Sequence, residues 1–355
     1  MDIATLTQIL EIAFEKKVSD IHFEVDTPPI FRARGHLIYS KLSKLTPKDT
    51  EFIASTVMEQ HGKRLPENLM EFDTSYTLSN VGRFRVSIFR QRGSIGLVMR
   101  VIPHYIGTFD ELNLTPVLGN IAKAPNGLIL VCGPTGNGKS TTLASMIRYM
   151  NDNFTYNIIT IEDPIEYIFP SNKSCIIQRE VGIDTETFGG ALKASLRMDP
   201  DVIMVGEMRD LDTIDSCIKA AETGHLVLST LHTHNAVSTI NRIVGYFPSQ
   251  NQESVRMRLA EILVATISLR LVRNKTGEAV LPAMEIMYAT SSIKACIREG
   301  HLDEIENYIE KGRDEYFMQT LDQHLIQLCK QEVITLDEAK RISRSTDLER
   351  KLIYS

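Results

Sequence analysis

The stretch LILVCGPTGNGKSTTLASMIRYM, residues 128–150, joins a short apolar run, a glycine-rich turn and a helix-forming segment. The apolar run 128–132 predicts a buried strand, and residues 140–150 predict a helix. Between them, residues 133–140 match the pattern G-x-x-x-x-G-K-S/T in full. The order of strand, glycine-rich turn and helix is typical of an α/β domain that holds phosphate groups in the turn.

Each part of this turn has a physical reason. The glycines permit a tight turn in which the N–H groups from Gly136 to Lys139 point inward at phosphate oxygens. Lys139 brings a positive charge to the β- and γ-phosphates, and the hydroxyl of Ser140 is placed to ligate Mg²⁺. A chance match is the alternative, and the flanking strand and helix argue against it. We expect a nucleoside triphosphate to bind at Gly133, Thr135, Gly136, Asn137, Gly138, Lys139, Ser140 and Thr141.

The composition is that of a soluble globular protein. The chain has 355 residues, of which 43% are hydrophobic and 24% charged, and this length favours two domains. The formal net charge is −6 and no long basic block occurs, which disfavours tight non-specific nucleic-acid binding. Five cysteines without a C-x-x-C pair indicate reduced thiols in a cytosolic protein. The sequence shows neither a signal peptide nor an apolar run that could span a membrane.

The first hundred residues predict a small mixed α+β domain. A helix is expected over 2–17, because Asp2 can cap it and apolar residues recur on one face, at Leu6, Ile9, Leu10 and Ala13. A second helix is expected after Pro47. The expected strands are 20–25, a hairpin over 28–40 that turns at Arg34–Gly35, and two strands over 82–103 around Arg92–Gly93.

From residue 121 onward, short apolar runs alternate with helix-like segments. Runs that are apolar on both faces indicate a parallel sheet covered by helices on both sides. After Pro282 the pattern predicts helices up to the end, most clearly over 318–342. The predicted strands are 128–132, 157–161, 202–206 and 226–230, and the predicted regions are an α+β domain (1–103), a linker (104–120), an α/β core (121–290) and a C-terminal helical region (291–355).

Two acidic segments follow predicted strands of the core. The first, IITIEDPIEY at 158–167, contains Glu162, Asp163 and Glu166, and the second, DPDVIMVGEMRD at 199–210, contains Glu207. Hydrolysis of a triphosphate needs carboxylates that hold Mg²⁺ and polarise water, and the carboxyl ends of parallel strands form the ligand crevice. We therefore assign these carboxylates to the site. The alternative for each is a solvated loop residue or a helix N-cap.

Three histidines lie in or beside the last predicted core strand. His225 precedes it, and His232 and His234 follow it in the segment AETGHLVLSTLHTHNA, residues 221–236. His232 and His234 could form a metal pair, because alternate residues of a strand share a face, but no third ligand is obvious. A hydrogen-bonded histidine at a sheet end and a sensor of the γ-phosphate are the other interpretations.

Taken together, these segments resemble the bacterial secretion and pilus ATPases, and most of all the PilT family of type IV pilus retraction ATPases. GPTGNGKSTT matches the Walker A loop of that family, ITIEDPIEY its aspartate box, DPDVIMVGEMRD its Walker B segment and AETGHLVLSTLHT its histidine box. The order and spacing fit from SDIHFEV to the C-terminal helices. The resemblance implies a RecA-like P-loop core, preceded by a PAS-like α+β domain and followed by C-terminal helices.

The resemblance also implies roles for single residues. Glu166 matches the proposed catalytic glutamate, and Glu207 matches the Walker B glutamate that supports Mg²⁺ directly or through water. His225 and His232 match the histidine box. Arg85 and Arg100 match arginines thought to reach the nucleotide phosphates, and an arginine from a moving domain can neutralise charge on the γ-phosphate. The implied catalytic set is Glu166, Glu207, Lys139, Arg85, Arg100 and His232; Glu162, Asp163 and His225 complete the nucleotide site, with Ser140 and Glu207 for the metal.

The sequence departs from the family pattern at several positions. Gly206 and Glu207 stand where most P-loop enzymes have the Walker B aspartate. Asn137 replaces the more usual serine of the loop, and we expect little consequence because Asn tolerates turn geometry. In SIKACIREG, residues 292–300, Lys294 and Cys296 differ from the family's retraction-linked motif. The four-cysteine zinc module and longer N-terminal region of assembly and type II secretion ATPases are absent, which favours the retraction branch.

The family resemblance implies an ATP- and Mg²⁺-dependent motor that drives pilus retraction and twitching motility. The implied assembly is a homohexameric ring in the cytoplasm, peripheral to the inner membrane through a pilus platform protein and other pilus-base components. Three alternatives stay open at this stage. They are an accessory retraction ATPase or related assembly ATPase, a nucleic-acid translocase built on the same core, and a nucleotide-gated binding module without turnover.

Overall fold

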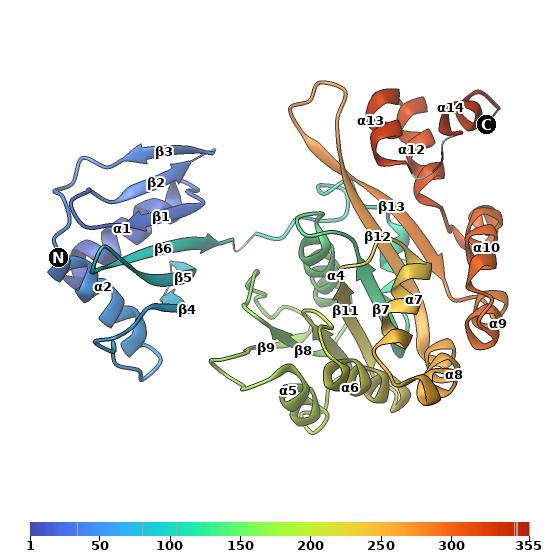
Figure 1. Ribbon diagram of the computed structural model, residues 1–355, viewed down its shortest axis with the longest axis horizontal. Helices are drawn as coiled ribbons and strands as arrows, with labels where there is room; N and C mark the ends of the chain where they lie inside the picture. Colours follow the sequence, from blue (N-terminus) through green and yellow to red (C-terminus); the bar gives the residue numbers. More distant parts are fainter. Residues whose placement is uncertain (34, 80, 104, 344, 346, 355) are drawn as a thin grey trace. The chain divides into compact units, whose positions relative to one another are not determined.

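The computed structural model describes residues 1–33, 35–79, 81–103, 105–343, 345 and 347–354 (Figure 1). It contains two compact units. The first comprises Met1–Tyr105 with the short segments Asp163–Phe169 and Glu180–Asp184, and the second comprises the other parts from Ile106 onward. The first unit thus includes two segments that the predicted domain ranges place in the core, and the predicted linker is largely part of the second unit.

The first unit is a mixed α+β domain. Its sheet has the strand order β3-β2-β1-β6-β5-β4, and every neighbouring pair is antiparallel. The elements are α1 (Ile3–Glu15), β1 (Asp20–Phe23), β2 (Ile30–Ala33), β3 (His36–Tyr39), α2 (Pro47–Glu59), β4 (Glu71–Leu78), β5 (Gly82–Gln91) and β6 (Ser94–Ile102).

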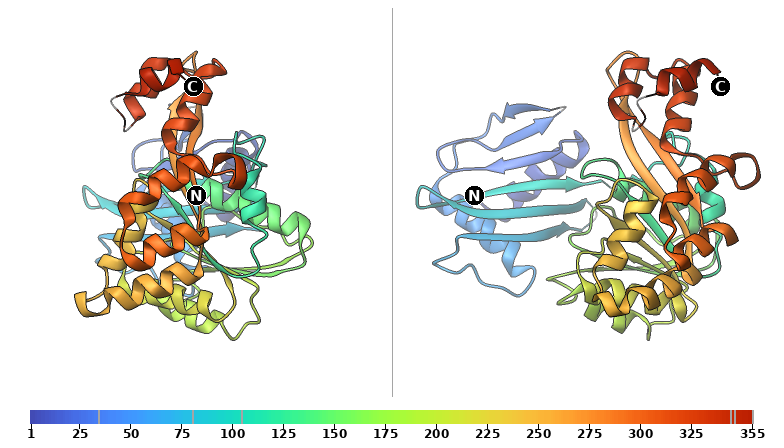
Figure 2. Two further views of the ribbon diagram at one scale, coloured as in Figure 1. Left: turned by 90° about the vertical axis from the view of Figure 1, so that its right-hand side faces the viewer. Right: turned by 45° about the vertical axis from the view of Figure 1, so that its right-hand side comes forward.

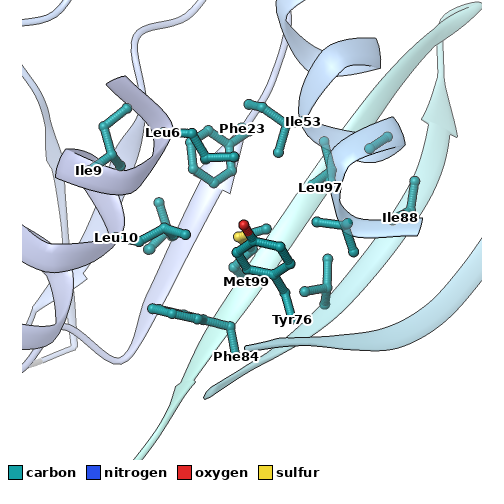
Figure 3. Packing of buried hydrophobic residues seen from close by; sticks show 14 of the residues in the cluster. Leu6, Ile9, Leu10, Phe23, Ile53, Tyr76, Phe84, Ile88, Leu97 and Met99 are labelled. Atoms are coloured by element: carbon teal, nitrogen blue, oxygen red, sulfur yellow. The ribbon is translucent and has the colours of Figure 1, made fainter. Parts of the chain in front are cut away.

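Helix α1 forms where its apolar spacing and its N-cap residue predict a helix. The Asp2 carboxylate accepts a hydrogen bond from the N–H of Thr5, which satisfies one of the free donors at the helix start. The apolar face of α1, together with α2, packs against the sheet in a common core (Figure 3). Its buried residues are Leu6, Ile9, Leu10 and Ala13, the four that the sequence predicts.

The turn between β5 and β6 sets the register of two arginines. Arg92 and Gly93 have φ values of 50° and 81°, a left-handed pair that matches the twist of a tight hairpin. The resulting register places Arg85 directly opposite Arg100. The predicted hairpin over 28–40 is also present as β2 and β3, although Arg34 of its turn lies outside the described residues. Strand β4 was not predicted.

The second unit is built on a sheet with the strand order β13-β12-β7-β11-β10-β8-β9. The pairs from β12 to β8 are parallel, as the apolar runs predict, whereas β12 and β13 form an antiparallel hairpin. The elements are α3 (Val117–Ile121), β7 (Gly127–Cys132), α4 (Lys139–Asn153), β8 (Asn157–Glu162), β9 (Cys175–Glu180), α5 (Phe188–Ser195), β10 (Val202–Val205), α6 (Leu211–Glu222), β11 (Leu226–Leu231), α7 (Ala236–Gly245), η1 (Ser249–Asn251), α8 (Gln252–Ile262), β12 (Leu263–Arg273) and β13 (Val280–Tyr288).

Helices cover both faces of this sheet (Figure 2). Helices α3 and α4 form one layer, and α5, α6, α7 and α8 form a connected layer on the other face, as right-handed crossovers between parallel strands require. The fold class is therefore the predicted one: an α/β core with a parallel sheet, preceded by a small α+β domain and followed by helices.

The prediction of helices directly after Pro282 is wrong. Pro282 lies within strand β13, opposite Leu271 of β12, and the strand continues to Tyr288. Strand β13 is at the edge of the sheet, where a residue without an N–H group is tolerated because no further strand needs the hydrogen bond. Strand β12 was not predicted either.

The C-terminal helices begin at Ser291, and α12 and α13 pack against the β12–β13 hairpin (Figure 1). No helix within the described residues is both long and apolar enough to cross a membrane. The helices are α9 (Ser291–Glu299), η2 (Leu302–Glu304), α10 (Ile305–Lys311), α11 (Arg313–Tyr316), α12 (Leu321–Lys330), α13 (Leu336–Ile342) and α14 (Leu348–Tyr354).

Candidate functional site

The phosphate loop follows β7 and leads into α4. Its glycines Gly133, Gly136 and Gly138 have φ values of 150°, 77° and 82°, which side chains rarely permit. A side chain at Gly133 would also clash, since a Cβ there would lie 2.7 Å from the carbonyl oxygen of Leu269. The N-cap of α4 is Gly138, which has no side chain to cap the first turn. The positive end of the α4 dipole thus lies at the loop, and the loop fits a phosphate chain.

Lys139 lies inside this loop rather than in solvent. The residue is 7% exposed, and its Nζ donates to the carbonyl oxygens of Gly133 and Pro134 at 3.0 and 3.1 Å. The same Nζ lies 3.4 Å from Nδ1 of His232. The ammonium group is therefore held at the centre of the loop, where a β- or γ-phosphate oxygen would meet it.

Asn137 connects the loop to strand β12. Its Oδ1 accepts a hydrogen bond from the N–H of Leu271 at 2.8 Å, and its Nδ2 donates to the carbonyl oxygen of Thr135 at 3.2 Å. Strand β7 ends at Cys132, opposite Ser268, so Asn137 takes the place of a strand partner for the part of β12 beyond it. The turn geometry alone predicts little consequence of Asn137, whereas the structure gives its amide a specific contact.

Glu207 lies where the phosphate loop lies, at the carboxyl ends of the parallel strands. It follows β10, and the backbone around it is tied to both neighbouring strands. The N–H of Gly206 donates to Ile161 at 2.8 Å, the hydroxyl of Thr230 donates to the carbonyl oxygen of Gly206 at 2.7 Å, and the N–H of Met208 donates to the carbonyl oxygen of Thr230 at 3.1 Å. Because the strands are parallel, their carboxyl ends bring Glu207 toward the loop, as the sequence predicts.

His232 joins Glu207 to the phosphate loop. Its Nε2 lies 3.4 Å from a carboxylate oxygen of Glu207, and its Nδ1 lies 3.4 Å from both the Thr135 hydroxyl and the Lys139 ammonium group. Arg209 also contacts Glu207, with which it forms an ion pair. The predicted site residues Lys139, Thr135 and Glu207 thus each contact His232, which links the carboxylate to the phosphate loop.

Glu162 ends strand β8 at this edge and is buried, with 6% exposure. One of its carboxylate oxygens accepts hydrogen bonds from the Thr160 hydroxyl at 2.7 Å and from the Gln178 amide at 3.1 Å. These bonds offset the loss of hydration of a buried carboxylate. Glu162 is therefore held in one orientation at the edge where the sequence places it.

The structure does not bring His225 to the phosphate loop. His225 precedes β11, whereas the loop follows β7, and the two strands are parallel with Leu226 opposite Gly127. The length of β11 therefore separates His225 from the loop, about 20 Å at about 3.3 Å per residue. His225 Nδ1 lies instead 3.0 Å from the carbonyl oxygen of Ala220. Within one chain, His225 therefore lies away from the phosphate loop, and its role at the nucleotide stays a prediction.

His234 points to a different partner from His232. Its Nδ1 lies 3.0 Å from the guanidinium group of Arg270 on β12. A guanidinium cation beside a histidine disfavours a metal ion there, so the pairing argues against the metal interpretation of His232 and His234. No group of three or more His, Cys, Asp or Glu side chains able to hold a metal ion occurs in the part of the chain that the structure describes.

A nucleotide-bound Mg²⁺ does not need such a group. Mg²⁺ keeps several waters and takes its other ligands from phosphates and one or two protein oxygens. Ser140 fits this requirement, because it is an exposed hydroxyl-bearing residue in the first turn of α4. Glu207 supplies a carboxylate at the same edge, with 15% of its side chain exposed.

The remaining predicted residues belong to the first unit. Arg85 and Arg100 are exposed, and Nε of Arg100 donates to the Asp20 carboxylate at 2.8 Å. Asp163 and Glu166 are exposed in the segment Asp163–Phe169. The hairpin places Arg85 directly opposite Arg100, on the consecutive strands β5 and β6, and their role at the nucleotide stays a prediction.

Several side chains that shape the site were missed at the sequence level. Glu180 accepts hydrogen bonds from the guanidinium group of Arg83 at 2.8 Å and from the N–H of Ile165 at 3.1 Å, and so holds the segment that carries Glu166. Gln178 on β9 showed no signal in the sequence. Thr230 did, because a polar residue within the buried run 226–230 must find a hydrogen-bond partner.

The segment 292–300 lies in helix α9 (Ser291–Glu299) and its C-cap Gly300, and the helix is amphipathic, with one buried face. Lys294, one of the departures from the family motif, donates from Nζ to the carbonyl oxygen of Glu261 at 3.0 Å. This contact closes the C-terminal end of α8, where a cation is favourable. Cys296, the other departure, is buried with 6% exposure.

The fold and the phosphate loop define a P-loop nucleotide-binding protein. The chain belongs to the family of type II/IV secretion system proteins, which matches residues 2–347. It is 40% identical over 335 residues to the type IV pilus retraction ATPase PilT of Pseudomonas aeruginosa, covering 94% of this chain and 97% of that protein. This similarity confirms the resemblance predicted from the motifs.

Two further comparisons agree with this assignment. The chain is 39% identical over 333 residues to the type IV pilus ATPase PilU of Pseudomonas aeruginosa, covering 94% of this chain and 87% of that protein. A crystal structure of the pilus retraction motor PilT with bound ADP superposes with a TM-score of 0.88 at 45% identity, covering 97% of this chain and 99% of that one. The similarity therefore extends over both units.

Proposed function

We propose that this protein is a Mg²⁺-dependent ATPase that drives type IV pilus retraction as a ring, a homohexamer by analogy with the family. The observation that carries the proposal is the contact set of Lys139, His232 and Glu207 at the edge of the core sheet. A binding module needs only the phosphate loop, whereas a hydrolase also needs a carboxylate and a sensing group beside it. The similarity to PilT over nearly the whole chain supports the assignment to retraction.

The residues of this chain have distinct parts in such a reaction. The loop glycines, Lys139 and Ser140 would hold the triphosphate, with Thr135, Asn137 and Thr141 shaping the loop. Glu166 would orient the attacking water or take its proton, Glu207 would support the metal directly or through water, and His232 would report the presence of the γ-phosphate. Mg²⁺ supplies neutralisation of the charge that develops on the phosphates.

The paired arginines of the first unit would provide the link to motion. Arg85 and Arg100 carry positive charge on neighbouring strands and are accessible. Guanidinium groups suit the oxygens of a phosphate group, so their engagement would depend on whether the γ-phosphate is present. A nucleotide-dependent displacement of the first unit would then do work on an inner-membrane platform protein and other pilus-base components from the cytoplasmic side.

The ATPase proposal is tested by phosphate release from the assembled protein at saturating ATP and Mg²⁺. We expect Lys139→Ala and Glu207→Ala each to reduce the rate at least about 100-fold, since each removes charge stabilisation at the phosphates or metal. Glu278→Ala, at an exposed position, serves as the matched control and should retain the wild-type rate. Full activity of Lys139→Ala would refute the proposal.

A genetic experiment separates retraction from its alternatives. Deletion of the gene should give hyperpiliated cells without twitching motility, whereas loss of pili would indicate assembly. The second candidate is an accessory retraction ATPase. That role predicts a deletion phenotype under only some of the conditions that require retraction. Stimulation of ATP hydrolysis by DNA would instead support a nucleic-acid translocase.

A further inference from the structure

Glu285 is a buried carboxylate that the proposed reaction does not use. It lies on β13 with 3% exposure. Its Oε1 accepts a hydrogen bond from the hydroxyl of Ser268 on β12 at 2.9 Å and another from the N–H of Ala236 at 2.8 Å. A buried carboxylate is tolerated only where hydrogen bonds replace its hydration. These two bonds therefore offset part of the cost of burying Glu285.

The hydrogen bond from Ala236 to Glu285 lies at the downstream end of the segment that carries His232 and His234. Ala236 is the first residue of α7, and the segment 232–235 joins it to the end of β11. A carboxylate at a helix N-terminus is stabilised by the helix dipole and by the free N–H groups of the first turn. β11 holds the upstream end of the segment in the sheet, and Glu285 holds its downstream end.

A second set of bonds closes the same segment from the side of α7. The hydroxyl groups of Thr233 and Thr239 lie 2.6 Å apart, and the Thr239 hydroxyl donates to the carbonyl oxygen of Asn235 at 2.7 Å. Four residues tied at both ends and across the middle have little freedom to move. The first of them is His232, so contacts outside the nucleotide site restrain the backbone that carries its ring.

Glu285 also reaches the base of the phosphate loop. Ser268, which donates to Glu285, accepts a hydrogen bond from the thiol of Cys132, the residue directly before the loop. Burial raises the pKa of this thiol, so it stays protonated and can act as the donor. One carboxylate thus connects the start of the phosphate loop with the end of the histidine segment.

We propose that Glu285 is a positioning residue for ATP hydrolysis, which sets the place of His232 between Glu207 and the phosphate loop. The 3.4 Å contacts of His232 with Glu207 and Lys139 leave little tolerance, and a displacement of about 1 Å can lower a rate about 100-fold. This inference rests on the ATPase activity proposed above. It assigns Glu285 to the catalytic step rather than to nucleotide binding.

The test compares two substitutions of nearly equal size. Glu285→Gln keeps an oxygen that can accept the Ala236 N–H, whereas Glu285→Met fills the same space without an acceptor. Phosphate release by the assembled protein should show kcat reduced at least about tenfold in Glu285→Met, with KM for ATP changed less than about threefold. Glu285→Gln should stay within about threefold of wild type. Glu278→Met, at an exposed position near the turn of the same hairpin, is the matched control.

A double-mutant cycle shows whether Glu285 acts through His232. In a His232→Ala background, Glu285→Met should lower kcat by less than about twofold, because the ring it positions is gone. An equal loss in both backgrounds would overturn the proposal, as would a Glu285→Met enzyme with the wild-type kcat. Should Glu285→Met fail to fold, Thr239→Val removes the bonds across the same segment and replaces it in the cycle.

Hydrogen exchange provides a readout that does not depend on activity. Amide exchange over 232–239 should rise at least about tenfold in Glu285→Met and stay at the wild-type level in Glu285→Gln, with α6 unchanged in both. Unchanged exchange in Glu285→Met would refute the anchoring. A wild-type protein without ATP hydrolysis would refute the proposed function, whereas the exchange experiment would still decide whether Glu285 holds the segment.

Discussion

The contact between Asn137 and Leu271 predicts a measurable effect of a single amide group. Strand β12 continues to Arg273, but its parallel partner β7 stops at Cys132. The N–H of Leu271 therefore has no strand partner on that side and donates to Asn137 Oδ1 at 2.8 Å. Asn137→Ala removes this acceptor and leaves the Leu271 N–H to water or to nothing.

The size of the effect follows from the partial burial of the site. An unsatisfied backbone donor costs about 1–3 kcal/mol when buried, and both residues are half-buried, so about 1–2 kcal/mol is expected. For a folded unit of this size, that change lowers the midpoint of thermal unfolding by about 2–8 °C. The loop that holds the phosphates would also lose one of its fixed points.

The assay is thermal unfolding with and without ADP and Mg²⁺, together with calorimetric titration of ADP. Asn137→Asp is the informative control, because it keeps the acceptor oxygen but adds a negative charge beside the phosphates. It should unfold within about 2 °C of wild type and bind ADP at least about tenfold more weakly. An Asn137→Ala protein with the wild-type midpoint would refute the argument.

Three further predictions concern other parts of the chain. Arg100→Lys should lower ATP hydrolysis at least about tenfold, because an ammonium group cannot engage phosphate oxygens as a guanidinium group does. It should leave the unfolding midpoint of the first unit within about 2 °C, because a cation still faces Asp20, whose side chain is only 9% exposed; a large loss of stability would indicate a structural role. Desolvation lowers the pKa of His324 from 6.5 to about 4, so stability is full above pH 6.5 and is lost as the pH falls toward 4. His324→Asn should reduce the loss of unfolding free energy between pH 7 and pH 5 by about 1–2 kcal/mol, measured by denaturant titration, and an unchanged pH dependence would contradict this. A maleimide should label exposed Cys175 at least about tenfold faster than Cys217, whose burial raises its thiol pKa, and equal rates by mass spectrometry would disprove the burial.

Most of the fold could be predicted because its signals are local. The four apolar runs of the core became β7, β8, β10 and β11, and the cap and apolar spacing of α1 were sufficient to place it. Strands β12 and β13 escaped prediction for a physical reason. Their hairpin contains Pro282, which usually ends a strand, and only its place at the edge of the sheet makes this residue acceptable.

The candidate site was predictable to a smaller extent. Lys139, Glu207 and His232 were expected at one edge, and the parallel strands bring them together there. His225 was expected with them, but its position before β11 puts it at the opposite edge. A motif shows which residues belong to one segment, whereas the direction of the strand decides which end of the segment reaches the ligand.

By itself, the sequence determined the phosphate loop, the alternation of strands and helices, and the family. These follow from residues close together in the chain, where glycine conformation, apolar period and helix capping act. Only the tertiary structure decided that Asn137 would complete strand β12, 134 residues further on, and that Glu285 would hold the segment of His232. Such contacts depend on strand order and register, which arise when distant segments pack and leave each buried polar group in need of a partner.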